Sequence, residues 1–273
     1  MRRNIDLQNL LSAVDVPAQW VGLREVFEAE TPRMIRDGVP VANMRYSTHG
    51  IMVEVLIDGQ FGYYGTPDMT TAGIDRAAKK AFQQAQLAAG SATFHFDESA
   101  RPAHTGSYRS PFVKDRESLS AGKLNALLMD AYTHLKVSDK IVSATSLCQV
   151  IEIATKFISS NGSDISQDFL MLEFDLRATA ADGTNQQTRS FGGMRGTCRQ
   201  MGMEYFDSHE IMAQASKIGE QALELLAADE CPSGEMDVVI APDQMMLQIH
   251  ESIGHALEVD RILGDERNYA GWS

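Results

Sequence analysis

The sequence lacks the apolar segments that would place a protein in or across a membrane. It contains no run of about eighteen apolar residues, the length that a membrane-spanning helix requires. Its amino-terminal stretch, M-R-R-N-I-D-L-Q-N-L-L, has no uninterrupted apolar core of the kind found in signal peptides, because Asp6 and the polar residues after it divide the stretch. The three cysteines are widely separated and odd in number, and they do not indicate a disulfide framework: Cys148, Cys198 and Cys231. We therefore expect a cytoplasmic protein with no membrane partner.

Positive charge is also scarce. The chain has 24 Lys and Arg against 37 Asp and Glu, for a formal net charge of −13, and it has no basic run. Because binding to nucleic acid depends on neutralising phosphates, this composition predicts no nucleic-acid partner. The 44% of hydrophobic residues and 22% of charged residues are typical of a globular protein of one large or several smaller domains.

Residues 1–92 are predicted to form a first block of strands followed by a helix. The dipeptide Asp58-Gly59 lies between two β-rich arms and predicts a hairpin turn. A helix should follow, with Thr70 or Thr71 as its amino-terminal cap and an apolar stripe that begins at Ile74. Two further strands are predicted at residues 20–30 and 41–46.

Residues 93–230 are predicted to form a second block. The segment at the start of this block, residues 91–111, is rich in Ser, His, Pro and Gly, which indicates a connecting segment. Turns are expected at Asn161-Gly162 and Asp182-Gly183. The periodicity predicts two helices and three strands: helices 116–136 and 209–228, and strands 141–158, 168–180 and 185–191.

Residues 231–273 are predicted to begin a third, carboxy-terminal domain. A short apolar strand is expected at residues 236–240, followed by a helix that carries the motif described next. We expect this domain to be represented only by its beginning, because an active site needs walls on all sides. The predicted fold class is α+β, with antiparallel sheets and flanking helices.

The stretch Q-I-H-E-S-I-G-H-A-L-E contains the pattern H-E-x-x-x-H, formed by His250, Glu251 and His255. Imidazole nitrogens are common zinc ligands, and a neighbouring carboxylate can act as general base toward a metal-bound water. The usual peptidase motif, H-E-x-x-H, has one residue fewer and places both histidines on one helical face. Here the histidines would diverge by about 140° on a regular helix. One π-type bulge, made easier by Gly254, would bring them onto the same face.

Two other interpretations of the same residues remain open. On a regular helix, Glu251 and His255 form an i,i+4 pair with Glu258 one turn further on, which is an ordinary solvated cluster, while His250 would be a partly buried core residue. Alternatively, a metal would be held by Glu251, His255 and Glu258, which leaves no carboxylate to serve as the base.

The surroundings of the motif resemble a known family. The sequence P-S-G-E-M-D-V-V-I-A-P, followed by L-Q-I-H-E-S-I-G-H-A-L-E-V-D, resembles the TldD/PmbA family, also called modulators of DNA gyrase or peptidase family U62. Upstream, V-E-V-L-I-D-G-Q-F-G-Y-Y-G-T is similar to the first block of that family, and F-G-G-M-R-G is similar to its middle block. The resemblance therefore runs through most of the chain.

The resemblance implies a metal-dependent peptidase subunit of TldD type. By this resemblance, His250 and His255 are zinc ligands and Glu251 is the catalytic base. The family acts on short or unfolded peptides as a dimer, either of identical subunits or with a PmbA-type (TldE) subunit. The family's third ligand is a cysteine in its carboxy-terminal domain, to which none of the three cysteines here corresponds, so Glu258 is expected as a substitute ligand or an orienting carboxylate.

Two functions from different classes follow. The first is a zinc metallopeptidase that hydrolyses peptide bonds. The second is a catalytically incomplete peptide-binding or dimerisation module, which would capture an extended peptide at an exposed strand edge. A direct DNA regulator, suggested by the family's older name, is disfavoured by the acidic charge.

Overall fold

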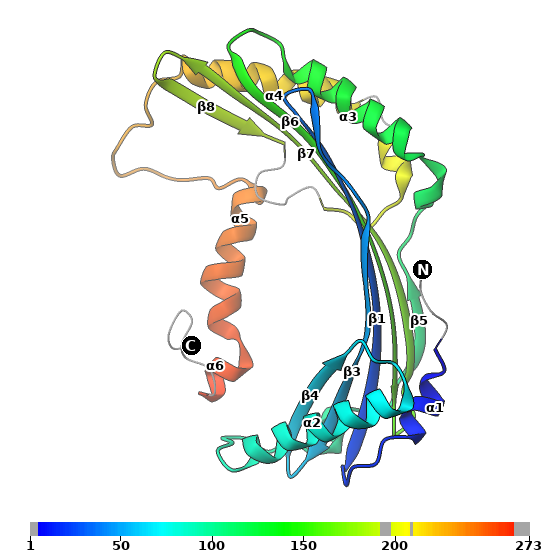
Figure 1. Ribbon diagram of the computed structural model, residues 1–273. Coiled ribbons are helices and arrows are strands. Elements are labelled where there is room, and N and C mark those ends of the chain that lie inside the picture. Colours follow the sequence, from blue (N-terminus) through cyan, green and yellow to red (C-terminus); the bar gives the residue numbers. More distant parts are fainter. Residues whose placement is uncertain (1–4, 192–197, 208–209, 265–273) are drawn as a thin grey trace.

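The fold is a strongly curved sheet with helices packed against it (Figure 1). The structure is a computed structural model that describes residues 5–191, 198–207 and 210–264. Its strands are β1 Trp20–Arg36, β2 Val39–Asn43, β3 Tyr46–Ile57, β4 Gln60–Thr66, β5 Thr105–Arg109, β6 Ile141–Ser159, β7 Asp164–Asp182 and β8 Asn185–Ser190. The helices are α1 Leu7–Ser12, α2 Thr71–Ala89, α3 Ala121–Leu135, α4 Glu210–Leu226, α5 Pro242–Gln248 and α6 Val259–Leu263. Shorter turns are η1 Glu98–Ala100, η2 Arg116–Ser118, η3 Met203–Asp207, the π-helix η4 Ile249–Gly254 and η5 His255–Leu257.

The eight strands form one sheet in the order β4-β3-β1-β6-β7-β5, with β2 paired to β1 and β8 paired to β7. Every pairing is antiparallel except that of β5 with β7. The predicted α+β class with antiparallel strands and flanking helices is therefore confirmed.

Local turn and cap signals account for the first hairpin and the helix after it. Asp58 and Gly59 have φ values of 50° and 77°, the left-handed pair that a two-residue hairpin requires, and they join β3 to β4 as predicted. Thr70 is the cap of α2, because its side-chain oxygen accepts a hydrogen bond from the N–H of Gly73 at 3.1 Å. A second Asp-Gly turn, at residues 37–38, ends β1 at Arg36, so this strand is longer than the predicted 20–30.

Two other predictions meet a different outcome, and a third concerns residues that the structure does not describe. The connecting segment 91–111 contains a strand, β5, which pairs with β7 from a distant part of the sequence. The strand expected at 236–240 is wrong, because this segment has no regular structure, and Val239 is 98% exposed. A strand needs a hydrogen-bonded neighbour, and none adjoins it among the residues that the structure describes. The F-G-G-M-R-G block occupies residues 191–196, and all of it except Phe191 lies outside the described residues.

The sheet carries two separate hydrophobic cores. In the first, α1 and α2 pack on β1 and β3, around residues such as Leu23, Val53 and Ile74. In the second, α3 and α4 pack on β6 and β7, around Leu128 and Phe174. Strand β1 pairs with both β3 and β6, so the sheet continues from one core to the other.

The carboxy-terminal segment differs from this body. In Figure 1 the helices from α5 to α6 stand on the concave side of the sheet, separate from its strands. Many of their apolar side chains are exposed, including Leu257 at 64%. Across the described parts of the chain, no helix is both long and apolar enough to cross a membrane.

Candidate metal centre

The helix that carries the motif changes its winding at the motif. It begins at α5 with Pro242 in the first turn, where the missing N–H of proline costs no helical hydrogen bond. It then widens into the π-helix η4, which contains His250, Glu251 and Gly254, and tightens into η5 from His255. The wider turn adds a residue to the helical repeat, so the two histidines lie on the same face. Their ring centroids are 4.6 Å apart and the rings are nearly perpendicular, at 89°.

The cluster of His250, Glu251 and His255 can hold a metal ion. Each residue offers one ligand atom, and these atoms lie within 4.8 Å of one another. The carboxylate of Glu251 lies near both imidazoles: its Oε1 is 3.8 Å from Nε2 of His250, and its Oε2 is 3.8 Å from Nε2 of His255. Two nitrogens bound to one tetrahedral zinc are about 3.3 Å apart, so small rotations of these side chains suffice. The donor types and the spacing therefore fit zinc.

The site is open to solvent on one side. The side chain of His250 is 63% exposed, that of Glu251 46% and that of His255 22%. The alternative in which His250 is a partly buried core residue is therefore wrong. In a solvated setting the charges of these groups are screened, so their mutual ion pairs contribute little to stability.

Glu258 lies behind His255 and outside the metal cluster. Its Oε1 is 2.9 Å from Nδ1 of His255, and its Oε2 is 2.9 Å from Nε of Arg261. The hydrogen bond with His255 lowers the pKa of Glu258, and the positive charge of Arg261 acts in the same direction. Arg261 was missed from the sequence, although its i,i+3 spacing from a glutamate at a helix start was a usable signal.

Gly254 lies in ordinary helical backbone. Its φ and ψ are −59° and −56°, which any residue adopts, and a Cβ placed there would meet the carbonyl oxygen of Ile249 at 3.4 Å. The π-turn therefore does not depend on the left-handed freedom of glycine.

None of the cysteines joins the candidate metal cluster within the described part of the chain. Cys148 is buried in the second core, and burial raises the pKa of its thiol to about 12. Cys198 and Cys231 are free and exposed.

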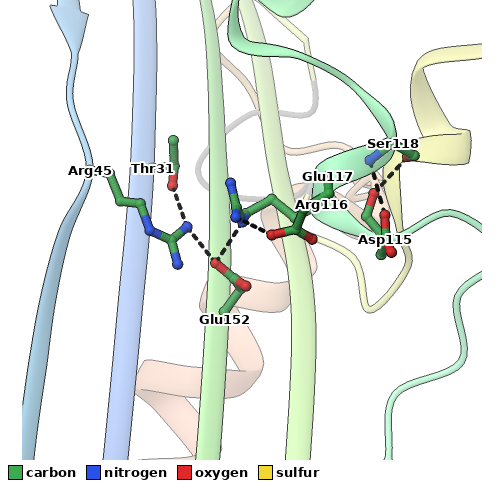
Figure 2. Close-up of polar contacts among 7 residues, drawn as sticks. All are labelled: Thr31, Arg45, Asp115, Arg116, Glu117, Ser118 and Glu152. Atoms are coloured by element: carbon green, nitrogen blue, oxygen red, sulfur yellow. Dashed lines mark hydrogen bonds and ion pairs between the residues drawn. The ribbon is translucent and has the colours of Figure 1, made fainter. Parts of the chain in front are cut away.

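A second polar cluster lies at the middle of the sheet (Figure 2), beside a surface pocket of about 430 Å³. Arg45 donates to Glu152 Oε2 at 2.5 Å, and Arg116 Nε lies 3.2 Å from the same oxygen. Arg116 also pairs with Glu117, and Arg45 donates to Thr31. Each charge here faces one of opposite sign, and these ion pairs join η2 to the sheet.

Comparison with known proteins identifies a family and two relatives to which the chain is similar. Residues 30–85 match a family described as PmbA/TldA metallopeptidase domain 1. A metalloprotease of Methanothermobacter thermautotrophicus is 26% identical over 264 residues, which are 94% of this chain and 54% of that protein. A metalloprotease of Methanocaldococcus jannaschii is 23% identical over 219 residues, 80% of this chain and 47% of that protein. The chain thus spans about half the length of these curated relatives.

Solved structures share the fold. A modulator of DNA gyrase from Thermotoga maritima superposes with a TM-score of 0.59 at 16% identity, covering 79% of this chain and 46% of the other. TldE from Thermococcus kodakarensis superposes with a TM-score of 0.53 at 14% identity, covering 81% and 47%. The matched family is described as a metallopeptidase family and both curated relatives are named metalloproteases, a class of protein that uses a metal cofactor.

Proposed function

We propose that this chain, which belongs to the TldD/PmbA family, is a zinc metallopeptidase subunit of TldD type. One observation carries the proposal: the π-turn of η4 gathers His250, Glu251 and His255 on one face, with their ligand atoms within 4.8 Å. A regular helix would have separated the two histidines. With the wider turn, the two histidines of H-E-x-x-x-H therefore lie on one helical face, as the histidines of the usual H-E-x-x-H peptidase motif do.

In the proposed mechanism each residue has a separate role. The Nε2 atoms of His250 and His255 would hold the zinc, and the bound zinc would polarise a peptide carbonyl and make water more acidic. Glu251 acts as the general base: its carboxylate accepts the proton of the attacking water and passes it to the leaving amine. Its position beside both imidazoles supports this role, because one of its oxygens lies 3.8 Å from Nε2 of His250 and the other lies 3.8 Å from Nε2 of His255.

The proposed substrates are short or unfolded peptides, because an open site admits an extended chain more easily than a folded one. The proposed assembly is a homodimer or a heterodimer with a PmbA-type (TldE) subunit, which would supply walls around the exposed ligands.

We propose the cytoplasm as the location of the protein, since its three cysteines are free. The domains remain those proposed at 1–92, 93–230 and 231–273. The two cores of the sheet follow the first boundary in most of their residues, with Ile35 in the second core and Ile158 in the first as the exceptions.

A second candidate function is a peptide-binding or dimerisation module without catalysis. Two observations favour it: His250 is exposed, and β4 lies at one edge of the sheet, where an extended peptide can add a strand. Under this alternative, peptide affinity would be the same with and without a metal chelator.

The substitution Glu251→Gln separates the two candidates. It keeps the size of the side chain and removes the base, so we expect peptide hydrolysis to fall about 10²–10⁴-fold while bound zinc is retained. The measurement is the rate on a fluorogenic peptide library, with zinc content determined in parallel. The matched control is Glu220→Gln, on the exposed face of α4, which should leave the rate unchanged. Hydrolysis that persists in Glu251→Gln would reject the assigned base.

A further inference from the structure

We infer that Glu258 and Arg261 are positioning residues that hold the ring of His255, keep the proton on its Nδ1 and leave its Nε2 for the metal. The inference rests on the proposed function and deepens it, because it names the two residues that fix one ligand. It also decides between the two roles expected for Glu258, an orienting carboxylate and a substitute ligand.

The two nitrogens of His255 face in different directions. Nδ1 lies 2.9 Å from Glu258 Oε1, whereas Nε2 lies 3.8 Å from Glu251 Oε2, on the side where His250 is found. An ionised carboxylate can only accept hydrogen bonds. The neutral ring of His255 must therefore carry its proton on Nδ1, and the lone pair of Nε2 is then directed into the cluster.

Arg261 holds Glu258 in place from the other side. Its Nε lies 2.9 Å from Oε2 of Glu258, and its side chain is only 3% exposed. The backbone adds a second connection, because the N–H of Arg261 donates to the carbonyl oxygen of Glu258 at 3.1 Å. Each oxygen of Glu258 thus has a partner other than the metal. This arrangement matches the carboxylate partners that orient metal-binding histidines in other proteins.

Zinc affinity of the full chain, measured by competition with a chromophoric chelator, tests the inference. We expect Glu258→Ala to weaken zinc binding about 10–100-fold. Glu258→Gln should lose less, because the amide oxygen can still accept from Nδ1, and Arg261→Met should fall between the two. The matched control is Asp237→Asn, an exposed carboxylate in the same carboxy-terminal segment, for which we expect less than a twofold change.

A second measurement requires no metal and detects the proton directly. Nitrogen-15 NMR of the metal-free chain, at a pH where the imidazole is neutral, should show His255 protonated on Nδ1 in the wild type and shifted toward the Nε2-protonated form in Glu258→Ala. A merely structural role of Glu258 would leave this tautomer unchanged. Glu258→Gln should restore the wild-type spectrum in part.

The outcomes are distinct. Wild-type zinc binding with unchanged affinity in every variant would overturn this inference and leave the proposed function standing. A Glu258→Gln variant that loses zinc altogether, with Arg261→Met unaffected, would make Glu258 a ligand and also overturn it. A wild-type chain that binds no zinc would overturn the proposed function, and this inference with it.

Discussion

The body of the sheet and the carboxy-terminal helices bury their apolar residues to very different degrees. In the body, Leu128 and Phe174 are 0% and 1% exposed, and two cores hold the helices against the strands. In the carboxy-terminal segment, Val239 and Leu257 are 98% and 64% exposed. Burial of apolar surface is the main source of folding stability. The body therefore carries the stability of this chain, and the segment carries its candidate chemistry.

The largest expected effect is on the free energy of unfolding, when one leucine in each region is replaced by alanine. Leu128→Ala should lower the free energy of unfolding by about 2–5 kcal/mol, because it leaves a cavity in the second core. Leu257→Ala, on the exposed segment, should change it by less than about 0.5 kcal/mol. Urea unfolding followed by circular dichroism measures both. Equal losses in the two variants would contradict the division of roles.

The next effect tests how closely the body is packed. Gly62 on β4 lies against α2, and a Cβ there would meet the carbonyl oxygen of Ala81 at 1.9 Å. Gly62→Ala should therefore destabilise the chain by about 1–3 kcal/mol, since strand and helix must move apart. The control is Gly122→Ala in α3, where a Cβ meets nothing within 4 Å and the higher helix propensity of alanine should stabilise by up to about 1 kcal/mol. A tolerated Gly62→Ala would show that α2 is loosely packed.

The smallest expected effect is on zinc affinity, when Gly254 in the motif is replaced. Because Gly254 has ordinary helical backbone angles, Gly254→Ala should change zinc affinity by less than about threefold, or 0.7 kcal/mol. The chelator competition described above measures it. A loss of tenfold or more would mean that the π-turn requires glycine, in contrast to the geometry found here.

Local signals in the sequence predicted the parts of the fold that local interactions decide. The hairpin at Asp58-Gly59 and the cap at Thr70 were predicted because the residue types themselves supply the turn and the hydrogen bond. Strand β5 was not predicted, because its five residues are all exposed and its parallel partner lies in β7, more than fifty residues away. Such a pairing leaves no periodic pattern in the strand itself.

The same distinction applies to the candidate site. The H-E-x-x-x-H spacing indicates which side chains need to meet, and a π-type turn, as predicted from that spacing, is the distortion that brings them together. The ion pair between Glu258 and Arg261 was not predicted, because it depends on a break in the helix between η5 and α6. At this break Glu258 has an extended backbone, with ψ 133°, and Arg261 lies in α6, from which its side chain reaches Glu258. The i,i+3 spacing indicates that the two residues can meet, but the sequence pattern contains no signal for the break in the helix at Glu258.

The zinc content of the purified chain, determined by elemental analysis with His255→Ala beside the wild type, is the most direct test of the proposed metal site. We expect about one zinc per chain in the wild type and its loss in the variant, because the proposal makes His250 and His255 the two imidazole ligands of the site. No zinc in the wild type, or the same zinc content in both proteins, would contradict it.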